Sequence, residues 1–178
     1  ERLVGSEMCI RDSSFESPKV YDKLLLPQDS PLRKAVVISN PLGEDFSIMR
    51  TISLNGMLTS LSTNFNRRNK NVRLYELGNI SLPKQVPVTE LPEERMQFTL
   101  GMYGEGDFFT MKGVIEEFLY KAGMKLKPEY DPEAGKPFLH PGRQANVVYD
   151  GTVIGYLGEV HPTVAANYSI KDLSLIHI

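Results

Sequence analysis

The order of apolar and polar positions predicts a strand and then a helix in the first half of the chain. Residues 33–39, RKAVVIS, form a short β-branched run that is typical of a buried strand, and the turn residues of NPLGED follow it. From Phe46 to Arg67 the apolar residues recur at spacings of three and four, which predicts a helix with one apolar face. That face consists of Leu54, Met57, Leu58, Leu61 and Phe65.

A pair of strands is expected next. Residues 71–82 are rich in strand-forming residues, and in residues 95–103 apolar and polar positions alternate. Between them, residues 83–94 contain three prolines and no period, so we expect a loop. Two strands joined by such a loop predict an antiparallel pair.

The second half predicts a helix, a hairpin and a short final helix. Asp107 is a good N-cap for a helix over residues 108–122, whose inward stripe would be Phe108, Met111, Ile115, Phe118, Leu119 and Ala122. Residues 124–130 predict a short edge strand. Asp150-Gly151 between two strand-forming runs predicts a two-residue hairpin turn. Pro162 suits the first turn of a short helix. Strands joined as hairpins indicate an α+β domain on an antiparallel sheet.

Composition narrows the class of protein without naming a function. The chain has 178 residues, enough for one domain with a core, and 41% hydrophobic and 24% charged residues are ordinary for a globular protein. The net charge of −2 gives no overall attraction to nucleic acid. The one cysteine, Cys9, forms no internal disulfide. No apolar run approaches the ~20 residues that a membrane helix needs, and no secretory signal is visible. We expect a cytoplasmic protein with no membrane partner.

Both ends of the chain differ in character from the sequence between them. The head ERLVGSEMCIRDS and the tail ending in LSLIHI are similar to short runs that arise when foreign bases are translated with a gene fragment. We therefore expect residues 1–13 and 172–178 to be non-native, and residues 14–171 to form the domain.

Five motifs, in one order, carry a resemblance to a known family. They are NPLGEDFSIMRT, NFNRRNKNVRLYELGNI, DFFTMKGVIEEFL, LHPGRQANV and IGYLGEVHPTV. The chain resembles the β subunit of bacterial phenylalanine–tRNA ligase, and the match runs from about Ser14 to Lys171. The resemblance implies an incomplete class II aminoacyl-tRNA synthetase-like fold, an antiparallel sheet flanked by helices. It also implies a module that has lost catalysis and packs on the α subunit in a heterotetramer of two α and two β chains.

The resemblance also implies what this segment binds. The whole enzyme uses ATP and Mg²⁺ to attach phenylalanine to tRNA(Phe), while this segment is expected to bind no cofactor or metal itself and to hold no catalytic residue. Its structural hallmark residues would be Asn40, Pro41, Arg50, Glu76, Gly78, Lys112, Gly113, His140, Pro141, Gly158, His161 and Pro162. Arg50 and Arg143 each follow a turn, where either would tie a loop to a carboxylate.

The predicted strand pair agrees with a loss of catalysis. In a class II site the first of two such strands ends in an arginine for the ATP phosphate. Here the corresponding stretch, residues 78–81, reads Gly-Asn-Ile-Ser. Neither Asn79 nor the nearby Lys84 supplies the planar bidentate contact that arginine gives.

Three other interpretations stay open at this point. His140, Glu159 and His161 could form a metal or acid–base site, although no zinc motif is present and a His-Pro corner is more often a cap. The basic run Arg67, Arg68, Lys70 and Arg73 could face tRNA, or could be the C-terminal turn of a helix, where cations are favoured. The chain could also be a free-standing class II-like enzyme that activates an acid with ATP, or an RNA-binding module.

Overall fold

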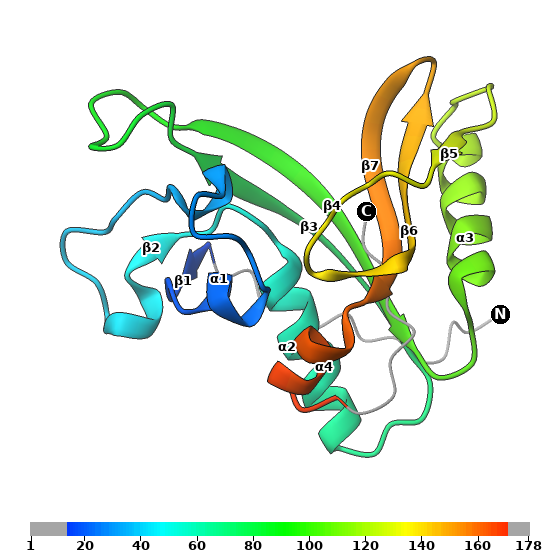
Figure 1. Cartoon of the computed structure of the whole chain (residues 1–178), viewed down its shortest axis with the longest axis horizontal. Coiled ribbons are helices and arrows are strands. Elements are labelled where there is room, and N and C mark those ends of the chain that lie inside the picture. Colours follow the sequence, from blue (N-terminus) through cyan, green and yellow to red (C-terminus); the bar gives the residue numbers. More distant parts are fainter. Residues whose placement is uncertain (1–13, 171–178) are drawn as a thin grey trace, which may run out of the picture.

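The chain folds into short helices and antiparallel strands, described here for residues 14–170 of a computed structural model (Figure 1). The elements in chain order are β1 (Phe15–Glu16), α1 (Val20–Lys23), the 3₁₀ turns η1 (Pro31–Arg33) and η2 (Glu44–Phe46), β2 (Ile48–Met49), α2 (Leu54–Asn66), β3 (Val72–Leu82), β4 (Glu93–Tyr103), α3 (Phe108–Lys121), β5 (Glu129–Asp131), β6 (Leu139–Tyr149), β7 (Thr152–Val160) and α4 (Pro162–Asn167). This is the α+β organisation that the sequence predicts.

The strands form three antiparallel sheets. β1 pairs with β2, β3 with β4, and β5, β6 and β7 form a third sheet in that order. In Figure 1, α2 lies along the β3–β4 pair, while α3 stands beside the hairpin of β6 and β7. A buried cluster joins Met102 of β4 to Met111 and Ile115 of α3 and to Leu157 of β7, so α3 connects the two larger sheets.

The long pair of β3 and β4 confirms the predicted strand–loop–strand. The register runs without a break from Val72 opposite Tyr103 to Leu82 opposite Glu93. Side chains alternate between the two faces of a strand, and along β3 Val72, Glu76 and Gly78, which share one face, are buried. The face that carries Leu77 is exposed.

The predicted helix from Phe46 to Arg67 is wrong in its first third. Residues 44–46 form the 3₁₀ turn η2. Ile48 and Met49 form the strand β2 because these two residues pair with β1. The helix α2 begins only at Leu54, after Ser53. The periodic pattern predicted the apolar face of α2 correctly, because Leu54, Met57, Leu58 and Leu61 are buried. The residues before the helix instead belong to a strand whose partner, β1, is distant in sequence.

The predicted buried strand at residues 33–39 is also wrong. Only an isolated bridge from Val37 to Ile48 forms there, with hydrogen bonds from Ile38 N–H to Ser47 O (2.9 Å) and from Met49 N–H to Val36 O (2.9 Å). The strand that this segment would extend, β2, is two residues long and offers few backbone groups. Val37 consequently faces solvent.

The second half follows the prediction closely. Asp107 caps α3 through a capping box, accepting from Thr110 N–H at 2.8 Å. Asp150 and Gly151 have φ of 49° and 72°, the left-handed conformation that a two-residue hairpin turn requires. Three details differ. Strand β5 covers Glu129–Asp131 alone. Phe118 of the predicted inward stripe is exposed, with its ring stacked on Phe98 at 4.6 Å, and Ala122 of that stripe is exposed just after the helix ends.

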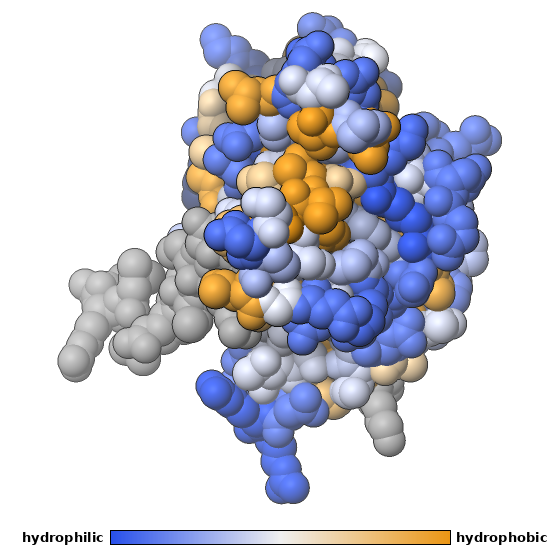
Figure 2. All heavy atoms as spheres, turned by 90° about the vertical axis from the view of Figure 1, so that its left-hand side faces the viewer, coloured by the Kyte–Doolittle hydropathy of each residue, from blue (hydrophilic) through white to orange (hydrophobic). Residues whose placement is uncertain are grey.

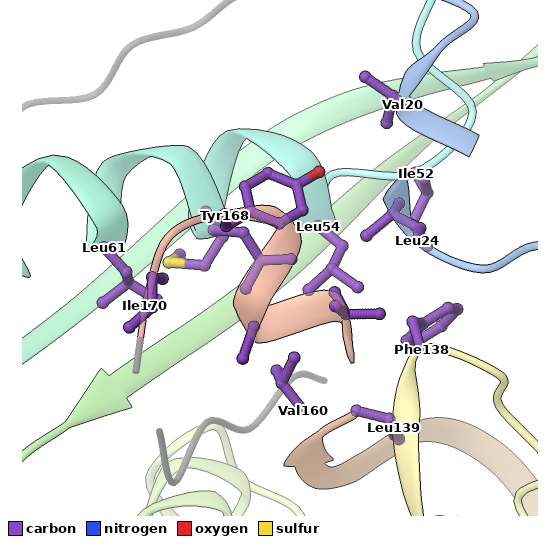
Figure 3. Close-up of a cluster of buried hydrophobic side chains, with 14 of the residues drawn as sticks. Val20, Leu24, Ile52, Leu54, Leu61, Phe138, Leu139, Val160, Tyr168 and Ile170 are labelled. Carbon is purple, nitrogen blue, oxygen red and sulfur yellow. The ribbon is translucent and has the colours of Figure 1, made fainter. Parts of the chain in front are cut away.

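The larger hydrophobic core lies between α2 and the two ends of the described chain (Figure 3). Figure 3 shows Val20 and Leu24 from the first helix, Leu54 and Leu61 from α2, and Tyr168 and Ile170 after α4. Segments about 150 residues apart in sequence therefore share one core. The position of α2 is fixed by what packs against it from both sides.

A truncation in this core tests the packing. Leu58 of α2 is fully buried, so Leu58→Ala is expected to lower the free energy of unfolding by about 2–5 kcal/mol, through lost transfer energy and the cavity left behind. Urea unfolding followed by circular dichroism measures this. The matched control is Thr59→Ala on the exposed side of the same helix, which should leave the midpoint almost unchanged. Equal effects of the two substitutions would contradict the packing.

Candidate functional site

Two of the expected hallmark residues, Arg50 and Glu76, form a buried ion pair. Arg50, directly after β2, places Nη1 at 2.5 Å from Oε1 of Glu76 on β3. The two side chains are only 2% and 10% exposed. Arg50 Nε also donates to the carbonyl oxygen of Asn79 at 2.7 Å. The arginine therefore ties a loop to a carboxylate, as expected, and its partner is Glu76.

The backbone holds this arginine in place from two sides. Arg50 N–H donates to Ser14 O at 2.9 Å, and Ser81 N–H donates to Arg50 O at 2.9 Å. Gly78 faces the guanidinium between these contacts, and a Cβ built on Gly78 would overlap Arg50 Nη2. A glycine is needed at Gly78 because any side chain there would displace the guanidinium from Glu76.

The end of β3 does not fit a nucleotide phosphate. Residues 78–81 present Gly-Asn-Ile-Ser, and the basic group opposite them, Arg95 on β4, is bonded to Glu93 at 2.6 Å on the surface. The hydrogen bond from Arg95 lowers the pKa of Glu93, so this carboxylate stays charged at neutral pH. Lys84 in the loop is likewise paired with Glu90 at 3.1 Å. The loop thus offers carboxylates where a polyphosphate would need unpaired cations.

The sheet face beneath this loop is filled by the fold itself. Ser53, just before α2, shares a 2.5 Å hydrogen bond with the Thr99 hydroxyl and donates to Gln97 Oε1 at 2.7 Å. Further along β4, a Cβ on Gly101 would lie 2.7 Å from Met57 Sδ and 2.8 Å from Leu61 Cδ1. Side chains of α2 therefore cover this face of β4, while the face that carries Tyr75 and Leu77 on β3 is exposed.

The histidines cap their own turns. His140 Nδ1 accepts from Gly142 N–H at 3.1 Å, and His161 Nδ1 accepts from Thr163 N–H at 3.2 Å as the N-cap of α4. An accepting Nδ1 carries no proton, so both rings are held in one tautomer. Glu159 is bonded to Arg143 at 2.5 Å. Within residues 14–170, no group of three His, Cys, Asp or Glu side chains is placed to hold a metal ion. The third histidine, His177, lies outside the described residues.

The basic run lies on the surface between α2 and β3. Arg67, Arg68 and Lys70 are exposed in the turn after α2, and Arg73 is exposed on β3. Arg68 has φ of 62°, and its N–H donates to Phe65 O at 2.8 Å, which closes the helix. Arg67 and Arg68 follow the last turn of α2, which itself holds no basic residue, whereas Arg73 lies on β3. A tRNA contact of this run stays a prediction.

The remaining hallmark residues occupy corners and helix surfaces. Asn40 and Pro41 are exposed in the turn before η2, and Pro141 is exposed on β6. Lys112 lies over the ring of Tyr130 at 4.4 Å, while its neighbour Gly113 is exposed on α3. Gly158 is packed so closely that a Cβ would lie 2.8 Å from Arg143 O. Pro162 is in the first turn of α4.

One buried charged residue was missed by the sequence analysis. Glu16 in β1 is 5% exposed, and Asn55 Nδ2 of α2 donates to its Oε1 at 3.1 Å. A glutamate in a strand of two residues has no periodic context that would predict its burial. A polar residue at the start of an apolar helix face, Asn55, was the one available signal.

The arrangement of these elements matches a solved structure. Pyrrolysyl-tRNA synthetase from Desulfitobacterium hafniense superposes with a TM-score of 0.70 at 13% sequence identity, covering 92% of this chain and 56% of that chain. The likeness shows that the fold is that of a class II aminoacyl-tRNA synthetase. Within residues 14–170, no helix is long and apolar enough to cross a membrane.

Sequence comparison then gives the family. Residues 10–178 match the model of the phenylalanyl-tRNA synthetase beta chain CLM domain, and the chain belongs to that family. The phenylalanine–tRNA ligase beta subunit of Clostridium acetobutylicum is 45% identical over 159 residues, which are 89% of this chain and 20% of that protein. The beta subunit of Clostridium tetani is 43% identical over 173 residues, 97% of this chain and 22% of that protein. The chain thus spans about a fifth of these relatives.

Removing one partner of the buried pair tests its role. Glu76→Gln is expected to lower the free energy of unfolding by about 3–5 kcal/mol, because the buried Arg50 loses its counter-charge. Urea titration at pH 7 measures the change. The matched control is Glu93→Gln, which removes a carboxylate from the exposed pair with Arg95 and should leave the midpoint unchanged. If both variants unfold at the same urea concentration, the buried pair does not hold the fold.

Proposed function

We propose that this domain is a non-catalytic module of a phenylalanine–tRNA ligase β subunit, and that it supports the ATP- and Mg²⁺-dependent attachment of phenylalanine to tRNA(Phe) by packing on the α subunit. The domain would span residues 14–171 and work in the cytoplasm. The observation that carries the proposal is the state of the class II strand–loop–strand in this chain. The strand–loop–strand is present, but residues 78–81 lack the arginine, and the cations Lys84 and Arg95 are paired with glutamates.

The alternative of a free-standing ATP-dependent enzyme has less support. An acid-activating class II site needs cations aimed at a polyphosphate and an open sheet face for the substrate. Here Arg50 is bonded to Glu76 and to Asn79 O. The face of β4 at Gly101 is in contact with α2. Residues 78–81 carry no arginine for a phosphate, and Arg50 serves an internal contact, which supports a structural role within a larger ligase.

A scaffold role requires a surface for its partner, and one face of the domain is suited to this. Figure 2 shows apolar side chains gathered in the middle of the face at the left-hand side of Figure 1, among hydrophilic ones. Figure 1 places the first third of the chain on that side, and this part of the sequence includes the exposed apolar residues Phe15, Val37, Leu42 and Phe46. Leu42 is 91% exposed. Several exposed apolar residues on one face are typical of a protein–protein contact. We assign this face, called the amino-terminal face, to the α subunit.

The proposal predicts that the chain binds the α subunit through the amino-terminal face. Coexpression with a phenylalanine–tRNA ligase α subunit should give a complex that coelutes in size-exclusion chromatography. Two buried carboxylates would be costly to desolvate in that contact, so Leu42→Asp with Phe46→Asp is expected to weaken the complex at least tenfold.

The control places a charge on an exposed apolar residue elsewhere. Val153 lies on β7 in the hairpin beside α3, and Val153→Asp should leave the complex intact. No complex with the unaltered chain would contradict the proposed role. Equal loss with both sets of substitutions would contradict the assignment of the face.

A further inference from the structure

Glu16 joins three segments that are far apart in the sequence. Its Oε1 accepts from Asn55 Nδ2 at 3.1 Å, and Asn55 Oδ1 accepts from the Tyr168 hydroxyl at 2.8 Å. β1 at the start of the described chain, the first turn of α2 and the turn after α4 are thereby connected through one polar chain. Figure 3 shows Tyr168 lying against α2 within the apolar core, and both hydrogen bonds of this polar chain are partly buried.

The protonation state of Glu16 follows from its surroundings. Its Oε2 is buried and has no hydrogen-bond partner among residues 14–170. The charged and titratable groups facing it are Arg50 after β2, Glu76 on β3, Tyr21 in α1 and Tyr168. Arg50 is the one cation of this set and is bonded to Glu76, so a second carboxylate would leave the cluster with an excess negative charge.

Burial outweighs the favourable contacts of Glu16. Desolvation raises the pKa of Glu16 from 4.5 to about 7, while the hydrogen bond from Asn55 and the charge of Arg50 lower it and the charge of Glu76 raises it. At a pH below the raised pKa, the carboxyl group in such a site is protonated and uncharged, and one of its two oxygens is a hydroxyl.

We propose that Glu16 is a proton-dependent latch that holds β1, and with it the segment through α1, against α2 and the carboxyl-terminal turn. The neutral acid bonds to Asn55 without burying a charge. When the proton leaves, an ionised carboxylate remains in the core, and β1 can regain solvation for it by detaching. β1 has two residues and one partner strand, β2, and the residue before it accepts one bond from Arg50 N–H, so few bonds hold β1 itself.

The sign of the pH effect is fixed by the direction of the shift. The pKa of Glu16 is higher in the folded chain than in the unfolded chain, so its stabilising effect is fully present below pH 4.5 and is lost as pH rises through about 7. Between pH 6 and pH 9 the unfolding equilibrium constant should rise about tenfold through this group alone. The other carboxyls with resolved shifts, Glu93, Asp107 and Asp131, have lowered pKa values and do not titrate in this window.

The test compares the pH dependence of three forms of the whole chain. Urea unfolding at pH 6 and pH 9 should show the tenfold rise for the unaltered chain and for Tyr168→Phe, which removes a hydrogen bond but keeps the carboxyl. Glu16→Gln, which has the shape of the neutral acid, should lose that rise. Hydrogen exchange of residues 14–24, corrected for intrinsic rates, should show the same difference in protection.

Two outcomes would overturn the proposal. One is a Glu16→Gln variant whose stability depends on pH as strongly as that of the unaltered chain. The other is available even if that variant does not fold. A carboxyl ¹³C titration of the unaltered chain that places the midpoint of Glu16 near 4.5 would show that the site holds no proton at neutral pH.

Discussion

The buried contact between Arg50 and Glu76 is the interaction on which the rest of this domain depends. A guanidinium enclosed by protein is very costly unless a carboxylate and further acceptors surround it. Glu76 and the carbonyl oxygen of Asn79 supply them, both from β3. This requirement fixes the register of β3 against the segment of Arg50 and demands a glycine at Gly78. The side chain of Arg50 thus holds β3, and its backbone bonds to Ser14 O, just before β1, and to Ser81 N–H.

The same contact supports the proposal that this domain uses a synthetase fold without a synthetase site. Residues 78–81 hold no arginine for a phosphate, and the buried Arg50 is bonded to Glu76 instead. Met57 and Leu61 of α2 cover one face of β4. The surface cations near the loop, Lys84 and Arg95, are paired with glutamates. Stability and catalysis compete for the same positions, and in this chain the residues serve stability.

Elements with a strong local signal were predictable from the sequence, and those set by distant contacts were not. The capping box at Asp107 and the hairpin turn at Asp150-Gly151 are fixed by residues next to one another, and both were predicted correctly. The strand predicted at residues 33–39 and the early start of α2 were wrong because β1, a strand of two residues, takes Ile48 and Met49 as its partners. The sequence predicted that Arg50 would pair with a carboxylate, but only the structure identifies Glu76 as that partner. The burial of Glu16 has no local signal at all.

The central claim is that this chain uses the nucleotide-binding positions of the class II fold for internal contacts. Calorimetry with ATP and Mg²⁺ tests this claim most directly. The whole chain, titrated at pH 7 with ATP up to millimolar concentration, should give only the heat of dilution. A catalytic class II synthetase measured in the same buffer provides the positive control. Saturable binding of one ATP per chain, abolished by Arg95→Ala, would contradict the account, because the strand–loop–strand would then still be a nucleotide site.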